Sequence, residues 1–129
     1  MENTTNALLP NAFALFNGIH SSSSGPDHGE SVLTLGPDSL NPYGLLHGGA
    51  YYTMADSACG TACRTDGRNY VTLHGGLNFI RSARSGTVTA RAVVRHRGRS
   101  TCQADVEITD ESGALLATGD FTFFCIGQR

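Results

Sequence analysis

The sequence contains no lysine, and its positive charge comes from nine arginines among 129 residues. Eleven acidic residues outweigh them, which gives a formal net charge of −2 at pH 7 and an isoelectric point near 6.2. Proteins that bind nucleic acid or an anionic membrane surface carry a clear excess of basic residues. The charge of this chain therefore argues against both kinds of partner.

Long apolar runs are also missing. No stretch approaches the roughly 18 consecutive apolar residues that a membrane-spanning helix needs. The first residues, MENTTNALLP, lack the basic start and the long apolar core of a secretory signal peptide. We therefore expect a cytoplasmic protein that does not associate with a membrane.

The four cysteines, Cys59, Cys63, Cys102 and Cys125, do not have the pattern of a metal site. Cys59 and Cys63 lack C-x-x-C spacing, and no histidine pair accompanies them. In a reducing compartment a free cysteine behaves as a small apolar residue. We therefore expect buried free thiols, no metal ion and no other cofactor.

The chain has the length of one domain, which we expect to span residues 1–129. Residues 1–29 are predicted to be irregular, with a short helix that starts at Asn11 and a turn-rich segment, SSSSGPDHG, that starts at Ser21. Residues 46–63 contain neither proline nor a turn cluster, and apolar residues recur in them every four positions. This spacing predicts one long helix.

The remaining elements are predicted to be strands. A short strand is expected over residues 30–35, and apolar and polar residues alternate clearly in residues 87–94 and 102–109. The turn TDESG precedes a last strand over residues 114–125. An antiparallel sheet must cover its apolar face, and only one predicted helix is long enough to do so. The sequence therefore predicts an α+β fold in which a curved antiparallel sheet wraps around one long central helix.

The tripeptide His-Gly-Gly occurs twice, at residues 47–49 and at residues 74–76. Only the first copy stands at the predicted start of a helix, with Asn41 before it and Asp56 after it. The second copy lies in a strand-like run. We expect its glycines to form a bulge, or to let the helix or a ligand approach the sheet closely.

The segment NPYGLLHGGAYYTMAD combines the pattern N-x-x-G-x-x-H-G-G with an aspartate further along the helix. It resembles the hotdog-fold acyl-CoA thioesterases of the phenylacetic-acid degradation (PaaI-like) type. The segments VTLHGGLNFIRSARSG, RHRGRS and VEITDESGALLATGDFTFF extend the resemblance over residues 37–124. It implies a hotdog fold and an enzyme that hydrolyses the thioester of an acyl- or aryl-acyl-coenzyme A.

Gly48 and Gly49 lie where the predicted helix begins. The first amide groups of a helix have no intrahelical acceptor and form the positive end of its dipole. Such a terminus can stabilise an oxyanion, and a glycine lets a carbonyl approach the backbone closely. The N–H of Gly48 is therefore expected to polarise the thioester carbonyl.

Asp56 is too far from Gly48 to act on the same carbonyl. Eight residues at about 1.5 Å each place them roughly 12 Å apart along one helix. Two antiparallel helices related by a two-fold axis would instead place each Asp56 opposite the partner's Gly48. We therefore expect a homodimer with shared sites. The resemblance implies the same arrangement, and relatives often pair into homotetramers.

The family pattern also implies roles for single residues. Asp56 would be the general base on water or the nucleophile that forms a transient anhydride, and the sequence leaves both routes open. Asn41 would hold the carbonyl or the water, His47 would mainly shape the loop, Gly49 would contact the substrate and Thr72 would orient Asp56 or the water. The alternatives are a solvated helix residue for Asp56, a structural histidine for His47 and the start of a turn for Asn41.

The basic segment RHRGRS, residues 95–100, is a candidate binding site for the phosphates of coenzyme A. Arginine binds phosphate through paired hydrogen bonds, although arginines at a strand end can equally be solvated. The resemblance implies that acyl-coenzyme A contacts this turn. The predicted substrate-binding residues here are Arg97, Gly98, Arg99 and Ser100.

Two other functions remain open from the sequence. A hydratase or dehydratase of the same fold also acts on acyl thioesters, but that chemistry generally needs a histidine paired with a carboxylate. A non-catalytic binder of acyl-coenzyme A would keep the fold without the reaction. The position of Asp56 in the motif favours the thioesterase.

Overall fold

The computed structural model describes residues 8–128. The elements in chain order are α1 (Ala12–Phe16), β1 (His20–Gly25), β2 (His28–Thr34), the 3₁₀ turn η2 (Pro37–Ser39), α2 (Gly48–Cys63), the 3₁₀ turn η3 (Arg64–Asp66), β3 (Arg68–Phe79), β4 (Thr87–Arg97), β5 (Thr101–Thr109) and β6 (Leu115–Gln128). No helix within residues 8–128 is long and apolar enough to cross a membrane.

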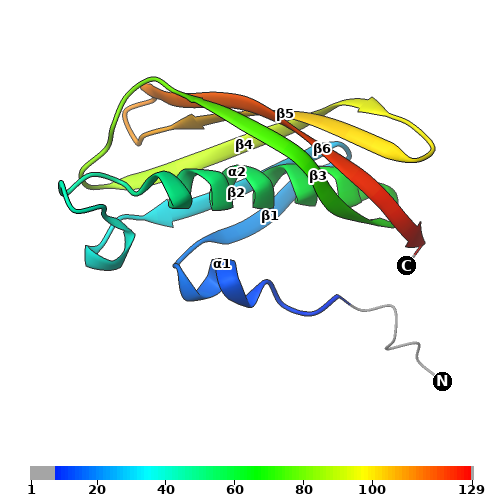
Figure 1. The fold of residues 1–129 in the computed structure, drawn as a ribbon, viewed down its shortest axis with the longest axis horizontal. Coiled ribbons are helices and arrows are strands. Elements are labelled where there is room, and N and C mark those ends of the chain that lie inside the picture. Colours follow the sequence, from blue (N-terminus) through cyan, green and yellow to red (C-terminus); the bar gives the residue numbers. More distant parts are fainter. Residues whose placement is uncertain (1–7, 129) are drawn as a thin grey trace.

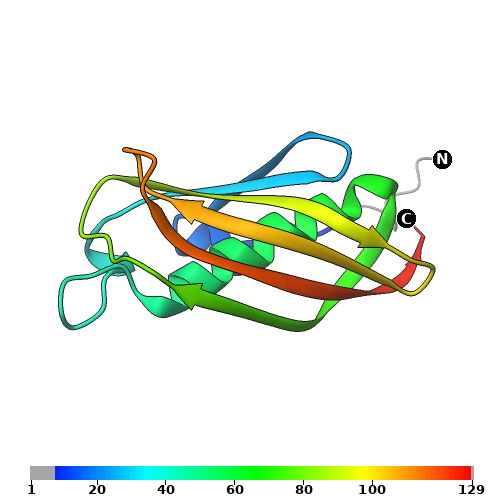
Figure 2. The same ribbon diagram turned by 90° about the horizontal axis from the view of Figure 1, so that it is seen from above.

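The six strands form one antiparallel sheet in the order β1-β2-β4-β5-β6-β3, so β1 and β3 are its edges. The sheet curves around α2, which runs along its concave side (Figure 1). Seen from above, the long strands cross over the helix along most of its length (Figure 2). The predicted α+β fold, a curved antiparallel sheet around one central helix, is confirmed.

The prediction of an irregular segment over residues 1–29 is wrong for residues 20–25. They form β1, which pairs antiparallel with β2, and β2 begins at His28, before the predicted start of that strand. Five of the six β1 residues are exposed, so the run of serines lacks the apolar alternation that marks a half-buried strand. Pairing with a neighbouring strand overrides weak strand propensity. Residues 1–7 of the predicted segment lie outside the described residues.

Small residues let α2 approach the sheet closely. A Cβ added to Gly29 in β2 would overlap the backbone of Ala58 in α2. Met54 and Ala58 are fully buried at this contact. Ser31, also fully buried, donates from its hydroxyl to the Met54 carbonyl at 2.7 Å. The helix therefore packs directly on β2, with one polar group satisfied inside the contact.

The second His-Gly-Gly lies inside β3. The pairing of β3 with β6 shifts register between Thr72 and His74, before these glycines. The two glycines themselves pair in register with Phe121 and Asp120, so the predicted bulge at the glycines is wrong. A Cβ added to Gly75 would overlap the ring of Phe121, a buried residue of β6. Gly75 is therefore a spacer that lets an aromatic ring pack against the backbone of the edge strand.

The cysteines are free thiols, as predicted. Cys59, Cys63 and Cys102 are buried and Cys125 is half-buried. Burial raises the pKa of the Cys59 and Cys63 thiols far above the ordinary range. Both groups therefore stay protonated and act as apolar core residues.

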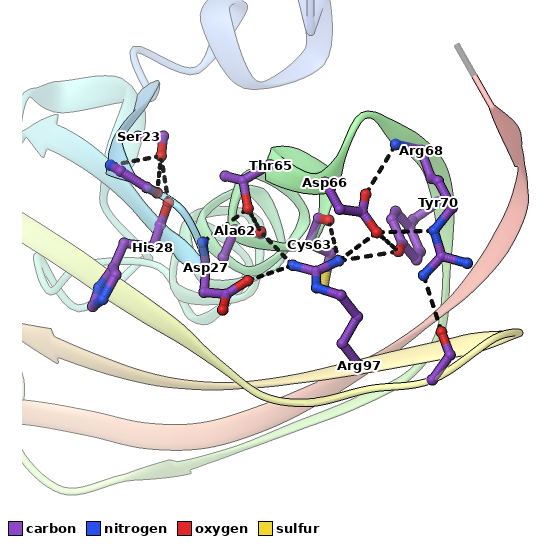
Figure 3. Close-up of polar contacts among 12 residues, drawn as sticks. Ser23, Asp27, His28, Ala62, Cys63, Thr65, Asp66, Arg68, Tyr70 and Arg97 are labelled. Atoms are coloured by element: carbon purple, nitrogen blue, oxygen red, sulfur yellow. Dashed lines mark hydrogen bonds and ion pairs between the residues drawn. The ribbon is translucent and has the colours of Figure 1, made fainter.

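Arg97 closes the C-terminal end of α2 (Figure 3). Its Nη1 donates to the Cys63 carbonyl at 2.8 Å and to the Tyr70 hydroxyl at 3.1 Å. The guanidinium also forms ion pairs with Asp27 and Asp66, each at 2.7 Å. A positive charge here satisfies a terminal carbonyl and faces the negative end of the helix dipole.

Asp66 is the most heavily bonded carboxylate of this network. Burial raises its pKa, but hydrogen bonds from Tyr70 and Arg68 and the charge of Arg97 outweigh burial and bring the pKa to about 2. A carboxyl group whose pKa is lower in the folded state stabilises the fold above its ordinary pKa, near 4. This contribution is lost as the pH falls from about 4 towards 2.

We predict that Arg97→Ala lowers the free energy of unfolding by about 2–3 kcal/mol, because it removes the charged donor to the Cys63 carbonyl and one of the two arginines paired with Asp66. Urea denaturation measures the loss. Arg95→Ala is the matched control, since the Arg95 and Asp105 side chains of its ion pair are 60% and 47% exposed. The control should lose less than about 1 kcal/mol, and equal losses in the two variants would contradict the capping role of Arg97.

Candidate active site

The first His-Gly-Gly begins α2, and His47 is its N-cap. The Nδ1 atom of His47 accepts the N–H of Gly49 at 2.8 Å. The carbonyl of His47 accepts the N–H groups of Ala50 and Tyr51 at 2.9 and 3.3 Å. The N–H of Gly48 is left without an acceptor in the part of the chain that the structure describes. The cap therefore determines which amide of the first turn is open to a ligand.

Asn41 holds the loop that leads into α2. Its Oδ1 accepts the N–H groups of Tyr43 and Leu45 at 2.9 and 3.0 Å, and its own N–H donates to the Leu45 carbonyl at 2.7 Å. Gly44 completes the turn with a φ of +78°, a conformation that favours glycine. Both side-chain bonds use Oδ1, so the Nδ2 group of Asn41 remains available as a donor.

An open cleft of about 440 Å³ lies beside Gly48. Its walls come from the loop before α2, the first turn of α2 and the segment after β3. The lining residues are Asn41, Leu45, Leu46, Gly48, Tyr51, Phe79, Ile80, Arg81 and Ser82. The Tyr51 ring packs edge-on against Phe79, with centroids 5.0 Å apart. The cleft thus brings together Gly48 and Asn41, the two residues predicted to hold the carbonyl.

His47 and Gly49 line a different hollow, of about 250 Å³. Phe13 and Ile19 from the N-terminal segment form part of its wall. Since the N–H of Gly49 is bonded to His47, any contact of Gly49 with a substrate would not use this amide. Two hollows therefore flank the start of α2, and Gly48, whose amide is free, lines the larger of the two.

Asp56 lies in the middle of α2, beside the edge strand β3. The Oγ1 of Thr72 donates to Asp56 Oδ1 at 2.5 Å. Asp56 is half-buried and Thr72 is exposed. The structure thus brings Thr72 to the position from which it was predicted to orient Asp56.

The two parts of the predicted site are separate within one chain. Gly48 and Asn41 line the cleft at the start of α2, whereas Asp56 is not among its lining residues. Asp56 lies about 12 Å further along the same helix. One chain therefore holds both halves of the site without bringing them together.

The turn of residues 97–100 lies at the opposite end of α2 from the cleft (Figure 1). The side chain of Arg97 is fully engaged with the end of the helix, as described above. Arg68 donates to two carbonyls of the turn, at 2.8 and 2.9 Å. Arg99 and Ser100 are exposed, so their side chains are the ones that this turn presents to solvent.

Tyr51, Arg81 and Ser82 line the cleft, although the sequence did not identify them as site residues. Tyr51 belongs to the first turn of α2. Arg81 and Ser82 reach the cleft because the N–H of Leu46 donates to the Ala83 carbonyl at 2.8 Å, which joins the segment after β3 to the loop before α2. A contact between segments so far apart has no local sequence pattern. The two arginines of RSARSG are the only sequence feature that indicates a ligand-binding role for this segment, and they are equally typical of a solvated turn.

The geometry of these residues gives less support to a hydratase or to a metal-dependent enzyme. His47 forms no hydrogen bond or ion pair with a carboxylate within residues 8–128, whereas a hydratase generally pairs these groups. Among the described residues, no group of three or more His, Cys, Asp and Glu side chains could hold a metal ion.

Comparison with known sequences identifies a family. Residues 43–117 match the model of the Thioesterase superfamily. The chain is 32% identical over 124 residues to a putative esterase of Haemophilus influenzae, a match that covers 94% of this chain and 90% of the relative. It is 34% identical over 94 residues to the acyl-coenzyme A thioesterase PaaI of Escherichia coli, covering 70% of this chain and 67% of PaaI.

Solved structures agree with the sequence comparison. The E. coli PaaI protein superposes with a TM-score of 0.87 at 30% identity, over 92% of this chain and 87% of that chain. A hypothetical thioesterase protein of Streptococcus pneumoniae, solved with coenzyme A, gives a TM-score of 0.81 at 30% identity, over 86% and 88%. Alanine variants of that protein replace an aspartate and a threonine with the same spacing in sequence as Asp56 and Thr72. By sequence and by fold, this chain belongs to the hotdog-fold thioesterase superfamily.

Proposed function

We propose that the protein hydrolyses the thioester of an acyl- or aryl-acyl-coenzyme A. The observation that carries this proposal is the free N–H of Gly48 at the start of α2, beside a cleft of about 440 Å³. A carbonyl bound there would be polarised by the amide and by the helix dipole. Relatives support the substrate class, since PaaI is an acyl-coenzyme A thioesterase and the Streptococcus protein was solved with coenzyme A.

Asp56 supplies the reactive carboxylate. The hydroxyl of Thr72 bonds Oδ1, which fixes the group and leaves Oδ2 for the reaction. As a general base, Oδ2 takes a proton from water while the water oxygen bonds to the carbonyl carbon. The C–S bond then breaks, and the sulfur leaves as the thiol of coenzyme A after it gains the proton. As a nucleophile, Oδ2 attacks the carbonyl carbon itself, the C–S bond breaks and coenzyme A leaves as the thiolate. Water then hydrolyses the resulting anhydride to the free acid and the Asp56 carboxylate, and a proton released in this step converts the thiolate to the thiol.

Gly48 and Asn41 act on the carbonyl oxygen in both routes. Negative charge develops on this oxygen when the carbonyl carbon is attacked, and the N–H of Gly48 donates to it. The Nδ2 group of Asn41 can donate to the same oxygen or to the attacking water. His47 holds Gly49 and so keeps the first turn of α2 in place.

A homodimer with antiparallel α2 helices completes each site. It would place the Asp56–Thr72 pair of one subunit against the cleft of the other. The edge strand β3 lies on this side of the helix, and its Val71 and Leu73 are 47% and 58% exposed, which supports the burial of this side in a contact. A homotetramer built from two such dimers stays a prediction.

The same arrangement suggests how residues 97–100 could contact coenzyme A. The end of α2 lies about 10 Å beyond Asp56, so this turn of one subunit would extend past the cleft of its partner. Arg99 and Ser100 would then bind the pantetheine or phosphate end of coenzyme A. Arg97 and the backbone of Gly98 would position the turn, since the Arg97 side chain holds the end of α2.

We predict that Asp56→Asn lowers kcat by 10²-fold or more, because an amide can neither take the proton of water nor attack as a nucleophile. Release of free thiol from a panel of acyl-coenzyme A substrates, followed with a thiol-reactive dye, measures the effect. Glu107→Gln, on an exposed side chain, is the control for loss of one negative charge. Absence of thiol release by the unmodified protein from every substrate would overturn the proposed function.

We predict that Thr72→Val lowers kcat about tenfold with a smaller change in KM, because the carboxylate of Asp56 loses the donor that fixes it. Thr72→Ser keeps the hydroxyl and should restore most of the rate. Thermal denaturation of both variants separates this effect from a loss of folding. If Thr72→Val keeps full activity, Thr72 does not orient Asp56.

Mixed dimers test whether the sites are shared. Gly48→Pro replaces the amide hydrogen by a ring methylene and fits the backbone here: His47 before it has an extended ψ of 136°, and an added Cβ meets nothing within 4 Å. A proline is therefore tolerated at this first helical position. Gly48→Ala, which keeps the N–H, is the control.

We predict that Gly48→Pro and Asp56→Ala are each inactive and that their coexpressed mixture recovers about a quarter of the unmodified activity. Half of the dimers would be mixed, and each mixed dimer would hold one intact site of two. Activity is measured by thiol release and dimer formation by light scattering. A mixture that forms dimers and remains inactive would place each site within one chain.

A further inference from the structure

The cleft beside Gly48 has an unusual set of polar groups. Among the described residues that line it, Arg81 is the only charged one and none is acidic. The other polar groups are largely donors, namely the N–H of Gly48 and the Nδ2 of Asn41, while the hydroxyl of Ser82 can donate or accept. Such a cleft suits a ligand that is rich in acceptors and negatively charged.

The backbone that carries Arg81 is held in place from two sides. The N–H groups of Ile80 and Arg81 both donate to the Leu116 carbonyl, at 2.8 and 3.1 Å. The Tyr51 hydroxyl donates to the Arg81 carbonyl at 3.2 Å. Arg81 is thus presented to the cleft by a fixed backbone, which limits the entropy lost when its side chain binds a ligand.

The guanidinium of Arg81 has no protein partner at bonding distance. It forms no hydrogen bond or ion pair with any residue in the range 8–128. Arg68, Arg91, Arg95 and Arg97, by contrast, all form ion pairs. The charge of Arg81 contributes to the lowered pKa of Asp110, but the Asp110 carboxylate is already bonded to Ser112 and Ala114.

We propose that Arg81 binds an anionic oxygen group of the thioester substrate in this cleft and so determines substrate specificity. The group is either a phosphate of coenzyme A or a carboxylate at the far end of the acyl chain. Both offer paired oxygens to the planar guanidinium. The inference rests on the proposed function, because it takes the thioester carbonyl to lie at Gly48.

The test compares Arg81→Gln with the unmodified enzyme on four thioesters. Two are coenzyme A thioesters, one of hexanoate and one of adipate, which adds a terminal carboxylate. The other two are the N-acetylcysteamine thioesters of the same acids, which lack the phosphates. Hexanoyl-N-acetylcysteamine therefore carries neither anionic group. Arg84→Gln is the matched control, since Arg84 is exposed on the same loop but does not line the cleft.

A phosphate contact predicts that Arg81→Gln lowers kcat/KM about tenfold on both coenzyme A thioesters and leaves both N-acetylcysteamine thioesters unchanged. A carboxylate contact predicts the same loss on the two adipoyl thioesters alone. In either case the loss should lie in KM, diminish at high salt and be partly rescued by Arg81→Lys. An equal loss on all four thioesters, or no loss on any, would overturn the inference.

Calorimetry separates this inference from the proposed function. If the unmodified protein hydrolyses none of the four thioesters, the proposed function fails, but Arg81 can still be tested with coenzyme A and with the non-hydrolysable thioether analogues of hexanoyl- and adipoyl-coenzyme A. A lower affinity of Arg81→Gln for one of these ligands, with Arg84→Gln unchanged, would support the anion contact. Equal affinities of all three proteins would overturn it.

Discussion

One helix must cover the apolar face of a six-stranded sheet, and the arrangement of the molecule depends on how closely it does so. The contact is made with small residues, because Gly29 of β2 leaves room for the backbone of α2 at Ala58. Met54 and Ala58 are fully buried in it. A larger residue at position 29 would push the helix away from the sheet, and both ends of the helix would move with it.

Both ends of this helix are held by side chains that are not part of its regular turns. His47 accepts an amide at the start, and Arg97 donates to a carbonyl at the end. These contacts fix the helix along its axis as well as against the sheet. The position of Asp56 relative to either end is therefore a rigid property of the fold, and Thr72 adds a fixed point on the neighbouring strand. Preorganisation of this kind is what the proposed reaction centre, with one half from each of two subunits, needs.

The sequence predicted features that depend on local pattern. Apolar residues recur every four positions in residues 46–63, and this predicted α2 nearly to its ends. The alternation of apolar and polar residues predicted β4 and β5. The first His-Gly-Gly could be separated from the second because only one stands at a helix start. Thr72 was placed beside Asp56 through the family resemblance, and the two side chains do meet.

Features that depend on distant contacts could not be predicted in the same way. β1 is a run of exposed serines that becomes a strand only through pairing with β2. The sequence predicted a contact of Arg97 with coenzyme A, with a solvated strand end as the alternative. In the folded chain Asp27, Asp66 and the end of α2 converge on its guanidinium. Arg81 reaches the cleft because two loops join by one backbone hydrogen bond, between Leu46 and Ala83.

The hydrogen bond between Gly49 and His47 also decides the tautomer of a ring. Nδ1 accepts the amide hydrogen, so its lone pair is occupied and the neutral imidazole must carry its own hydrogen on Nε2. Nε2 of the neutral ring is then a donor and has no lone pair with which to take a proton from water. Of His47 and Asp56, only Asp56 is left with a lone pair that can take this proton, on its carboxylate.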